Sequence, residues 1–273
     1  MSTVTSNDGT RIGYDRIGAG PAVILVNGAL AYRDFWGHGP LAALLAGHFT
    51  VYTYDRRGRG ESNDAAQESA EQEFRAPIAL EREIEDLDAL IDEAGGSTFL
   101  YGDSSGGALV LEAAIRLGDK VRKIAMYEAP YNDDETGRQS WREYTKQLGE
   151  QLATDRWGDA VALFMELTGA TPDQIGEVRQ TPMWPIFEAV GHTLAYDHIA
   201  LLGEDASVPT GRAAGVAVPA LVMDGGASYP FMHDTALALV NAIPHAQHRT
   251  LEGQTHEVSP EVLAPVLIEF FKA

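Results

Sequence analysis

The sequence predicts an α/β fold built on a mostly parallel, doubly wound sheet that is interrupted by a helical insertion. Apolar, β-branched runs alternate with stretches of helical period along most of the chain, and the strand signal vanishes between residues 132 and 212. With 273 residues, of which 45% are hydrophobic, the chain can bury one large core. We therefore expect core segments at 1–131 and 213–273 and a helical segment at 132–212.

The first half of the chain alternates predicted strands with predicted helices. Its apolar, β-branched runs are Arg11–Arg16, Ala22–Val26, Thr50–Tyr54, Thr98–Tyr101 and Val121–Tyr127. A helix is predicted before the fourth run because Leu80, Ile84, Leu87 and Ile91 recur at helical spacing and Gly95-Gly96 follows. Residues 106–117 predict the next helix. A strand, helix, strand order of this kind is typical of a parallel sheet.

In the second half, strand character returns only after the insertion. Within the insertion, Trp141, Tyr144, Leu148 and Leu152 recur at helical spacing. The elements expected beyond it are a strand at Pro219–Met223, a helix at Thr235–Ala242, a short strand at Arg249–Leu251 and a final helix opening with Ser259, Pro260 and Glu261. Serine as N-cap, proline at the first helical position and an acid in the first turn form a helix-start pattern.

Composition excludes several classes of function. The chain has no cysteine, so disulfides, thiolate metal sites and cysteine nucleophiles are all absent. Its formal net charge of -20 repels phosphate backbones and anionic lipid, which predicts no nucleic-acid partner and no membrane-surface partner. The polar N-terminal stretch lacks a secretory signal pattern, and no apolar run reaches the roughly 18 residues of a membrane span, so we expect a cytoplasmic protein.

No cofactor motif accompanies these features. The sequence contains no phosphate-binding glycine loop, no clustered metal-ligand motif and no flavin signature, so we expect neither a cofactor nor a metal ion. The expected partner is a small-molecule substrate. Assembly into a homo-oligomer is left open by the sequence.

The segment Gly102-Asp103-Ser104-Ser105-Gly106 matches the pattern G-x-S-x-G. It follows a predicted strand directly and opens a predicted helix, which is the setting of a nucleophile elbow. Glycines suit this turn because side chains at positions 102 and 106 would collide with the neighbouring strand and helix. Ser104 is therefore the predicted nucleophile, and Ser105, which would break the glycine spacing, is its rival.

Together with Val23–Gly28, the run Tyr54–Ser62 and His256, this elbow resembles the α/β-hydrolase superfamily. The resemblance covers nearly the whole chain outside the insertion. It implies an eight-stranded, mostly parallel sheet with an α-helical cap at 132–212, inserted after the sixth strand. It also implies an oxyanion hole formed by the backbone N–H groups of Ala29 and Ser105. Asn27 departs from the family, which usually has histidine there, but the donor is a backbone group.

The resemblance also implies His256 as the general base, because this histidine alone of eight lies in the loop between the last short strand and the final helix. For the acid of the triad, the resemblance offers two positions. The family commonly places an aspartate a few residues after the seventh strand, where this chain has Ser228, and a neutral hydroxyl cannot stabilise an imidazolium as a carboxylate does.

A second acid position in the superfamily lies at the end of the sixth strand, where this chain has Glu128. That arrangement resembles some haloalkane dehalogenases and the fungal zearalenone lactonases, and the latter also carry a Ser-Ser-Gly elbow. Because the sixth and seventh strands are neighbours in such a sheet, a glutamate from one can reach a histidine otherwise served from the other. Glu128 is the predicted acid, and Asp224, at the end of the seventh strand, is the alternative.

The predicted activity is hydrolysis of a carboxylic ester or lactone through a Ser-His-acid triad and an acyl-enzyme intermediate. Aromatic residues of the insertion and its neighbourhood indicate an apolar or aromatic substrate, with Trp36, Trp184 and Phe187 as candidate pocket residues. Alternatives are a perhydrolase or haloperoxidase-like activity, a carbon–carbon bond hydrolase, and a relative that binds a small molecule without catalysis. Ser228 in the usual acid position motivates the last of these.

Overall fold

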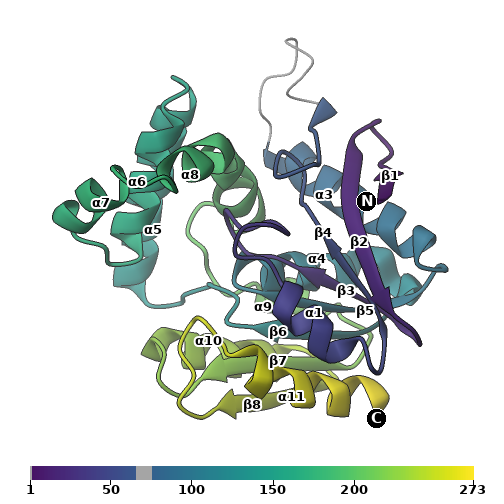
Figure 1. The fold of residues 1–273 in the computed structure, drawn as a ribbon. Coiled ribbons are helices and arrows are strands. Elements are labelled where there is room, and N and C mark those ends of the chain that lie inside the picture. Colours follow the sequence, from purple (N-terminus) through teal and green to yellow (C-terminus); the bar gives the residue numbers. More distant parts are fainter. Residues whose placement is uncertain (1, 66–75) are drawn as a thin grey trace.

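The computed structural model describes residues 2–65 and 76–273 and shows strands and helices that alternate along the chain (Figure 1). The strands are β1 (Ser2–Thr5), β2 (Arg11–Gly18), β3 (Ala22–Val26), β4 (Thr50–Tyr54), β5 (Thr98–Asp103), β6 (Val121–Tyr127), β7 (Ala220–Gly225) and β8 (Ala246–Leu251). The α-helices are α1 (Gly39–Leu45), α3 (Ala76–Glu93), α4 (Ser105–Leu117), α5 (Glu135–Leu152), α6 (Trp157–Leu167), α7 (Pro172–Val178), α8 (Trp184–Val190), α9 (Thr210–Ala213), α10 (Pro230–Ala242) and α11 (Pro260–Lys272). Shorter turns are the 3₁₀ helices η1 (Gly118–Lys120) and η2 (Gly191–Thr193) and the π-helix η3 (Ala195–Leu201).

The strands form one eight-stranded sheet in the order β1-β2-β4-β3-β5-β6-β7-β8. The pairs β1–β2 and β2–β4 are antiparallel, and every other neighbouring pair is parallel. The interior strands β3 and β7 are buried almost throughout, which explains why they are continuous apolar runs rather than alternating ones. This topology confirms the predicted mostly parallel, doubly wound α/β fold.

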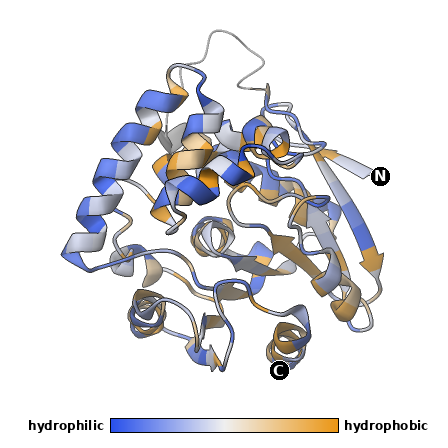
Figure 2. Ribbon diagram, turned by 60° about the vertical axis from the view of Figure 1, so that its left-hand side comes forward, coloured by the Kyte–Doolittle hydropathy of each residue, from blue (hydrophilic) through white to orange (hydrophobic). Residues whose placement is uncertain are grey.

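Helices cover both faces of the sheet, and the sheet separates the core into two main layers. Helices α1 and α11 pack against one face, where Leu45, Leu267 and Phe271 join the strand residues Leu25 and Phe99 in one cluster. Helices α3, α4 and α10 contribute to the larger cluster. Residues 105–114 of α4 are all buried, so this helix is apolar around most of its circumference. Figure 2 shows the hydrophobic colour along the central strands.

Between β6 and β7 the chain forms only helices and turns, from α5 to α9. Helices α5 to α8 gather at the upper left of Figure 1, on the side of the molecule away from α11. The π-helix η3 connects this insertion to the core, because it packs against both α3 and α4. None of the described helices is long and apolar enough to cross a membrane.

One strand was not predicted, and two predicted elements begin earlier in the structure. The polar strand β1 was not predicted, because it is held by backbone pairing to β2 and has no buried side chain. Helix α10 begins at Pro230 and strand β8 at Ala246, both earlier than their apolar patterns indicated. Ser259 does occupy the N-cap of α11, but its hydroxyl donates to the Glu261 carboxylate at 2.6 Å instead of accepting a backbone N–H.

Candidate active site

Ser104 lies in the sharp turn between β5 and α4, with a positive φ of 50°. Two glycines make this turn sterically feasible. A Cβ on Gly102 would collide with the carbonyl of Gly106, and one on Gly106 would collide with the carbonyls of Val26 and Asn27. All of these partners are backbone atoms that cannot rotate away. Ser104 is thus held in a strained conformation by packing on both sides, as expected for a nucleophile elbow.

Ser105, the rival nucleophile, is buried and already engaged. Only 1% of the residue is exposed, and its hydroxyl donates to Asp197 Oδ1 at 2.8 Å. Asp197 comes from η3 of the insertion. The Ser105 hydroxyl is therefore shielded from a substrate, whereas Ser104 is half-buried.

His256 and Glu128 meet at the ends of two distant segments. The Nδ1 atom of His256 lies 2.7 Å from Oε2 of Glu128. Glu128 is 2% exposed, and its carboxylate accepts two further hydrogen bonds, from the Gly225 N–H at 2.8 Å and from the Ser228 hydroxyl at 2.8 Å. Ser228 therefore occupies the expected acid position but acts as a donor to the carboxylate that comes from the neighbouring strand.

Tyr127, which belongs to no motif in the sequence, links the three parts of this arrangement. Its carbonyl accepts the Ser104 N–H at 2.9 Å, and its side chain donates to the carbonyl of Thr255, the residue before His256. Glu128 follows it directly in the chain and has a positive φ of 47°. Burial raises the pKa of Tyr127, so the phenol keeps its proton and remains a donor. The signal that could have identified it is its place at the end of β6, next to Glu128.

The electrostatic environment of His256 favours its protonated form. Burial by itself lowers the pKa of this imidazole, but the hydrogen bond to Glu128 and the negative charges of Glu128, Asp103 and Glu257 outweigh burial and raise the pKa above its ordinary value. Asp103 lies 2.9 Å from His38 Nε2, and its own pKa is lowered. Burial opposes this lowering, and the His38 and His256 charges cause it. A base that gains a proton from serine would be stabilised in this setting.

Within residues 2–65 and 76–273, no hydrogen bond joins the Ser104 hydroxyl to His256. Catalytic hydrogen bonds are commonly long in the absence of substrate and tighten on binding, so this separation is compatible with a nucleophile and base pair. Since Nδ1 of His256 faces Glu128, its Nε2 is the nitrogen left for a serine or a leaving group.

Asp224, the alternative acid, has other partners. Its Oδ2 lies 3.0 Å from His233 Nδ1, and its Oδ1 lies 2.5 Å from His248 Nε2. The Thr250 hydroxyl lies 3.3 Å from both oxygens. No hydrogen bond links Asp224 to His256 among the described residues, so the geometry favours Glu128 as the partner of His256.

The loop after β3 lies beside the elbow, as the oxyanion-hole prediction requires. A Cβ on Gly28 would lie 3.2 Å from the Ser104 Cβ and 3.7 Å from its hydroxyl oxygen. Ala29 follows Gly28, and Ser105 is the first residue of α4. In the described part of the chain, neither the Ala29 N–H nor the Ser105 N–H donates a hydrogen bond. Both donors are thus unengaged next to Ser104.

Buried charges connect this loop to the insertion. Arg56 donates to Asp197 at 2.6 Å and to the Asn27 carbonyl at 3.2 Å, and Arg59 donates to Asp197 at 2.5 Å and to the Gly28 carbonyl at 3.0 Å. These three side chains are at most 1% exposed. Burial alone would raise the pKa of Asp197, but the two arginines lower it, so the carboxylate stays charged. The arginine run is visible in the sequence, but its partner from the insertion is not.

Two of the three predicted pocket residues contact each other. Trp36 stacks on Phe35 with ring centroids 4.8 Å apart and meets the edge of Phe187, from α8, at 5.0 Å. Trp36 is 63% exposed, and its backbone has a positive φ of 56°. Trp184 instead is 8% exposed and lies under the Arg179 guanidinium, 4.6 Å from its ring centroid. Its surroundings are those of a packing residue of the insertion.

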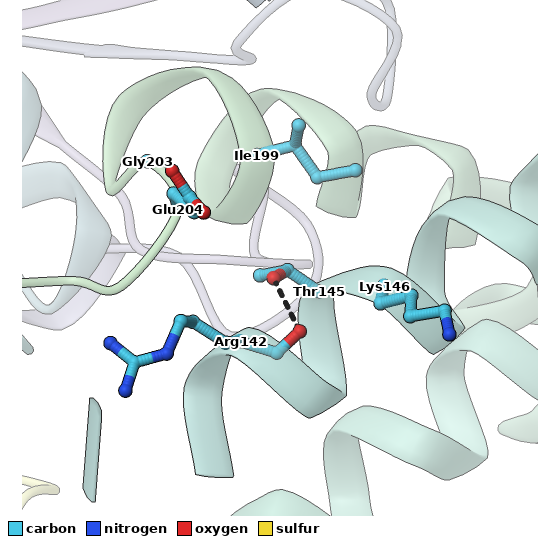
Figure 3. Close-up of a pocket in the computed structure, with 6 residues that line it drawn as sticks. All are labelled: Arg142, Thr145, Lys146, Ile199, Gly203 and Glu204. Carbon is cyan, nitrogen blue, oxygen red and sulfur yellow. Dashed lines mark hydrogen bonds between the residues drawn. The ribbon is translucent and has the colours of Figure 1, made fainter. Parts of the chain in front are cut away.

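Figure 3 shows a hollow on the insertion that contains no residue of the predicted triad. It has a volume of about 510 Å³ and is lined by Arg142, Thr145, Lys146, Ile199, Gly203 and Glu204. The lining comes from α5 and the segment that begins with η3. This hollow is therefore separate from the chemistry at the strand ends.

The site thus combines a serine in a strand-turn-helix setting, a histidine that faces a strand-end carboxylate, and unengaged backbone donors. The chain belongs to the α/β hydrolase family, whose sequence pattern matches residues 23–262. It is similar to an α/β hydrolase from Sphaerobacter thermophilus, with 46% identity, coverage of 99% of this chain and 100% of that one, and a TM-score of 0.83.

Two further matches are less similar. An esterase from Thermogutta terrifontis shares the fold, with a TM-score of 0.72 at 20% identity over 99% of this chain and 97% of that one. The uncharacterized hydrolase YraK of Bacillus subtilis is 31% identical over 121 residues, which are 44% of this chain and 41% of that relative. This chain thus matches less than half the length of that curated relative.

Proposed function

We propose that this hydrolase cleaves a carboxylic ester or lactone, with Ser104 as nucleophile, His256 as general base and Glu128 as the acid of the triad. The observation that carries the proposal is the 2.7 Å contact between His256 Nδ1 and Glu128 Oε2. It fixes the ring so that Nε2 is free to accept the serine proton. Gly225 and Ser228 hold the carboxylate in place, so Glu128 is preorganised rather than recruited by the substrate.

In the proposed mechanism, the Ser104 oxygen attacks the carbonyl carbon while His256 takes its proton. The carbonyl oxygen becomes negative and accepts hydrogen bonds from the N–H groups of Ala29 and Ser105. The protonated imidazole, stabilised by Glu128, then donates the proton to the leaving alkoxide oxygen as its bond to the carbonyl carbon breaks, and the alcohol departs. Water repeats the sequence on the acyl-enzyme, releases the acid and restores Ser104. In a lactone the leaving hydroxyl group remains attached to the acyl group, so this second step releases a single hydroxy acid.

In this proposal, the helices between β6 and β7 belong to a cap of residues 132–212. The support is the aromatic contact between Trp36 of the core and Phe187 of α8, together with the buried Arg56–Asp197 pair. An exposed tryptophan held at positive φ beside the oxyanion loop suits recognition of an apolar or aromatic group. Replacement of Trp36 by alanine should then raise KM for aryl esters more than for acetate esters of small alcohols.

The test combines turnover with labelling. Purified protein is offered a panel of aryl esters and lactones, and a fluorophosphonate is used to label the nucleophile. Ser104→Ala should abolish both turnover and labelling, whereas Ser105→Ala, its neighbour, should keep the label. If the wild-type protein turns over none of the panel and the fluorophosphonate leaves Ser104 unmodified, the proposal is wrong. Saturable binding with no product by mass spectrometry would favour a binding protein.

A further inference from the structure

A second cluster of chemically active side chains lies near the end of β7, with no member from the proposed triad. Asp224 is the second-last residue of β7, His233 lies on α10 and His248 lies on β8. One ligand-type atom from each lies within 4.8 Å of the others. The Nδ1 atom of His233 and the Nε2 atom of His248 face different oxygens of the same carboxylate, at 3.0 Å and 2.5 Å.

Asp224 is a buried carboxylate that faces two histidines. The carboxylate is 1% exposed, and in the described part of the chain its ion-pair partners are His233 and His248, with no arginine or lysine. Histidine is mostly neutral at pH 7 unless its environment protonates it. Buried charges are ordinarily paired or bound to a metal, and a cation held between these three side chains would neutralise the carboxylate.

We propose that Asp224, His233 and His248 bind one divalent transition-metal ion of the Zn²⁺ type. Two imidazole nitrogens and one carboxylate oxygen form a ligand set that suits Zn²⁺ and its neighbours in the first transition row. Binding needs both facing nitrogens unprotonated, so each neutral ring carries its N–H on the other nitrogen. Such a site differs from the sequence prediction of no metal ion. Nothing in the sequence indicated it, because the three residues meet only in the folded chain.

The three ligand atoms lie within 4.8 Å of one another and must rearrange to bind such an ion. Bonds of about 2.0–2.2 Å in tetrahedral geometry place ligand atoms roughly 3.3 Å apart, so the Asp224–His248 contact must open by several tenths of an ångström. The His233 side chain is 48% exposed and the His248 side chain 22% exposed, which leaves both rings room to turn. The Thr250 hydroxyl, 3.3 Å from both Asp224 oxygens, orients the carboxylate from outside the ligand set.

The exposure of the three proposed ligands indicates how open the metal site is to solvent. The carboxylate forms a buried floor and the imidazoles form a half-exposed rim, so solvent can supply the fourth ligand. The ion would connect β7, α10 and the edge strand β8, and it would bind the folded chain only. Zn²⁺ should therefore raise the melting temperature of the protein.

The experiment uses the full chain after treatment with a chelator and its removal. ZnCl₂ is titrated by isothermal calorimetry, and Co²⁺ binding is followed by visible absorption, which reports the coordination geometry. The wild-type protein should bind one ion per chain and melt at a higher temperature with Zn²⁺. Because loss of partners outside the ligand set already costs about 10–100-fold in affinity, His233→Ala or His248→Ala should weaken binding by at least about 100-fold.

His245→Ala is the matched control, since His245 is exposed and only three residues from His248. It should bind Zn²⁺ as the wild type does. All three histidine variants should keep the ester-hydrolase activity of the wild type, which shows that they fold and separates this proposal from the one on the triad. Absence of stoichiometric Zn²⁺ binding, or equal binding by the double variant His233→Ala/His248→Ala, would overturn the proposed site.

Discussion

The substitution Glu128→Gln tests the proposed triad most directly, because the hydrogen bonds around Glu128 determine how a glutamine must sit. The Gly225 N–H can only donate, so the amide oxygen must stay at the Oε1 position. The amide NH₂ then faces His256 Nδ1, where it donates. The imidazole is thereby forced to carry its proton on Nε2, which is the wrong tautomer for accepting the serine proton.

The lost charge adds to this effect. Two unit charges about 4 Å apart interact by about 4 kcal/mol at an effective dielectric constant of about 20. The His256 side chain is 37% exposed, so we halve that figure to about 2 kcal/mol for solvent screening. At about 1.4 kcal/mol per factor of ten, the charge alone accounts for roughly 30-fold. With the tautomer penalty, kcat should fall by about 10²–10⁴-fold.

The assay is steady-state hydrolysis of the best aryl ester or lactone found, with circular dichroism to confirm the fold. Asp224→Asn is the comparison, because it removes the alternative acid and should leave turnover near the wild-type rate. A folded Glu128→Gln protein with near-normal turnover, beside an inactive Asp224→Asn protein, would show that Asp224 rather than Glu128 is the acid of the triad.

Three further outcomes follow from the structure. The pKa of His256 is raised above its ordinary value, and the base works only when neutral, so kcat/KM should rise with pH through a midpoint above about 6.5. Asp197→Asn leaves Arg56 and Arg59 short of negative charge in a buried site, so denaturant unfolding should show a loss of about 3 kcal/mol. Gly106→Ala drives a Cβ into backbone carbonyls, so thermal unfolding should show a loss of about 1–3 kcal/mol or an unfolded protein.

Each of these outcomes has its own control. In Glu128→Gln, the residual kcat/KM should reach its midpoint at a lower pH than in the wild type, because the carboxylate no longer raises the pKa of His256. An unchanged midpoint would show that Glu128 is not what raises this pKa. Asp159→Asn removes a half-exposed ion pair of the insertion, with Arg179, and should cost less than about 1 kcal/mol. If Asp159→Asn lowers the free energy of unfolding as much as Asp197→Asn does, burial of the ion pair is not the reason for the loss in Asp197→Asn. Gly149→Ala meets no atom within 4 Å and should leave stability unchanged or raised.

Local patterns carried enough information to predict the sheet and the elbow. The runs at Ala22–Val26, Thr50–Tyr54 and Val121–Tyr127 coincide with β3, β4 and β6, because apolar and β-branched residues fill most of the buried positions of these strands. The glycines at 102 and 106 indicated a sharp turn for the same steric reason that the structure shows. Polar β1 escaped prediction because edge pairing needs only backbone groups.

The site depended more on tertiary contacts. The sequence indicated Ser104 from its motif and offered His256 by resemblance, but the choice between Glu128 and Asp224 needs the directions of two side chains from adjacent strands. In the structure, Glu128 turns toward His256, and Asp224 turns toward His233 and His248.

Features that depend on neighbours along the chain were therefore readable from the residues: periodicity, turn glycines and the order of elements. The pairing of distant charges was not, because it needs the folded chain, as for Asp197 with the arginines and Asp224 with two histidines. The difference is one of range. Backbone sterics and burial patterns act over a few residues, whereas a buried carboxylate is paired by whichever donors the fold brings within about 3 Å of it.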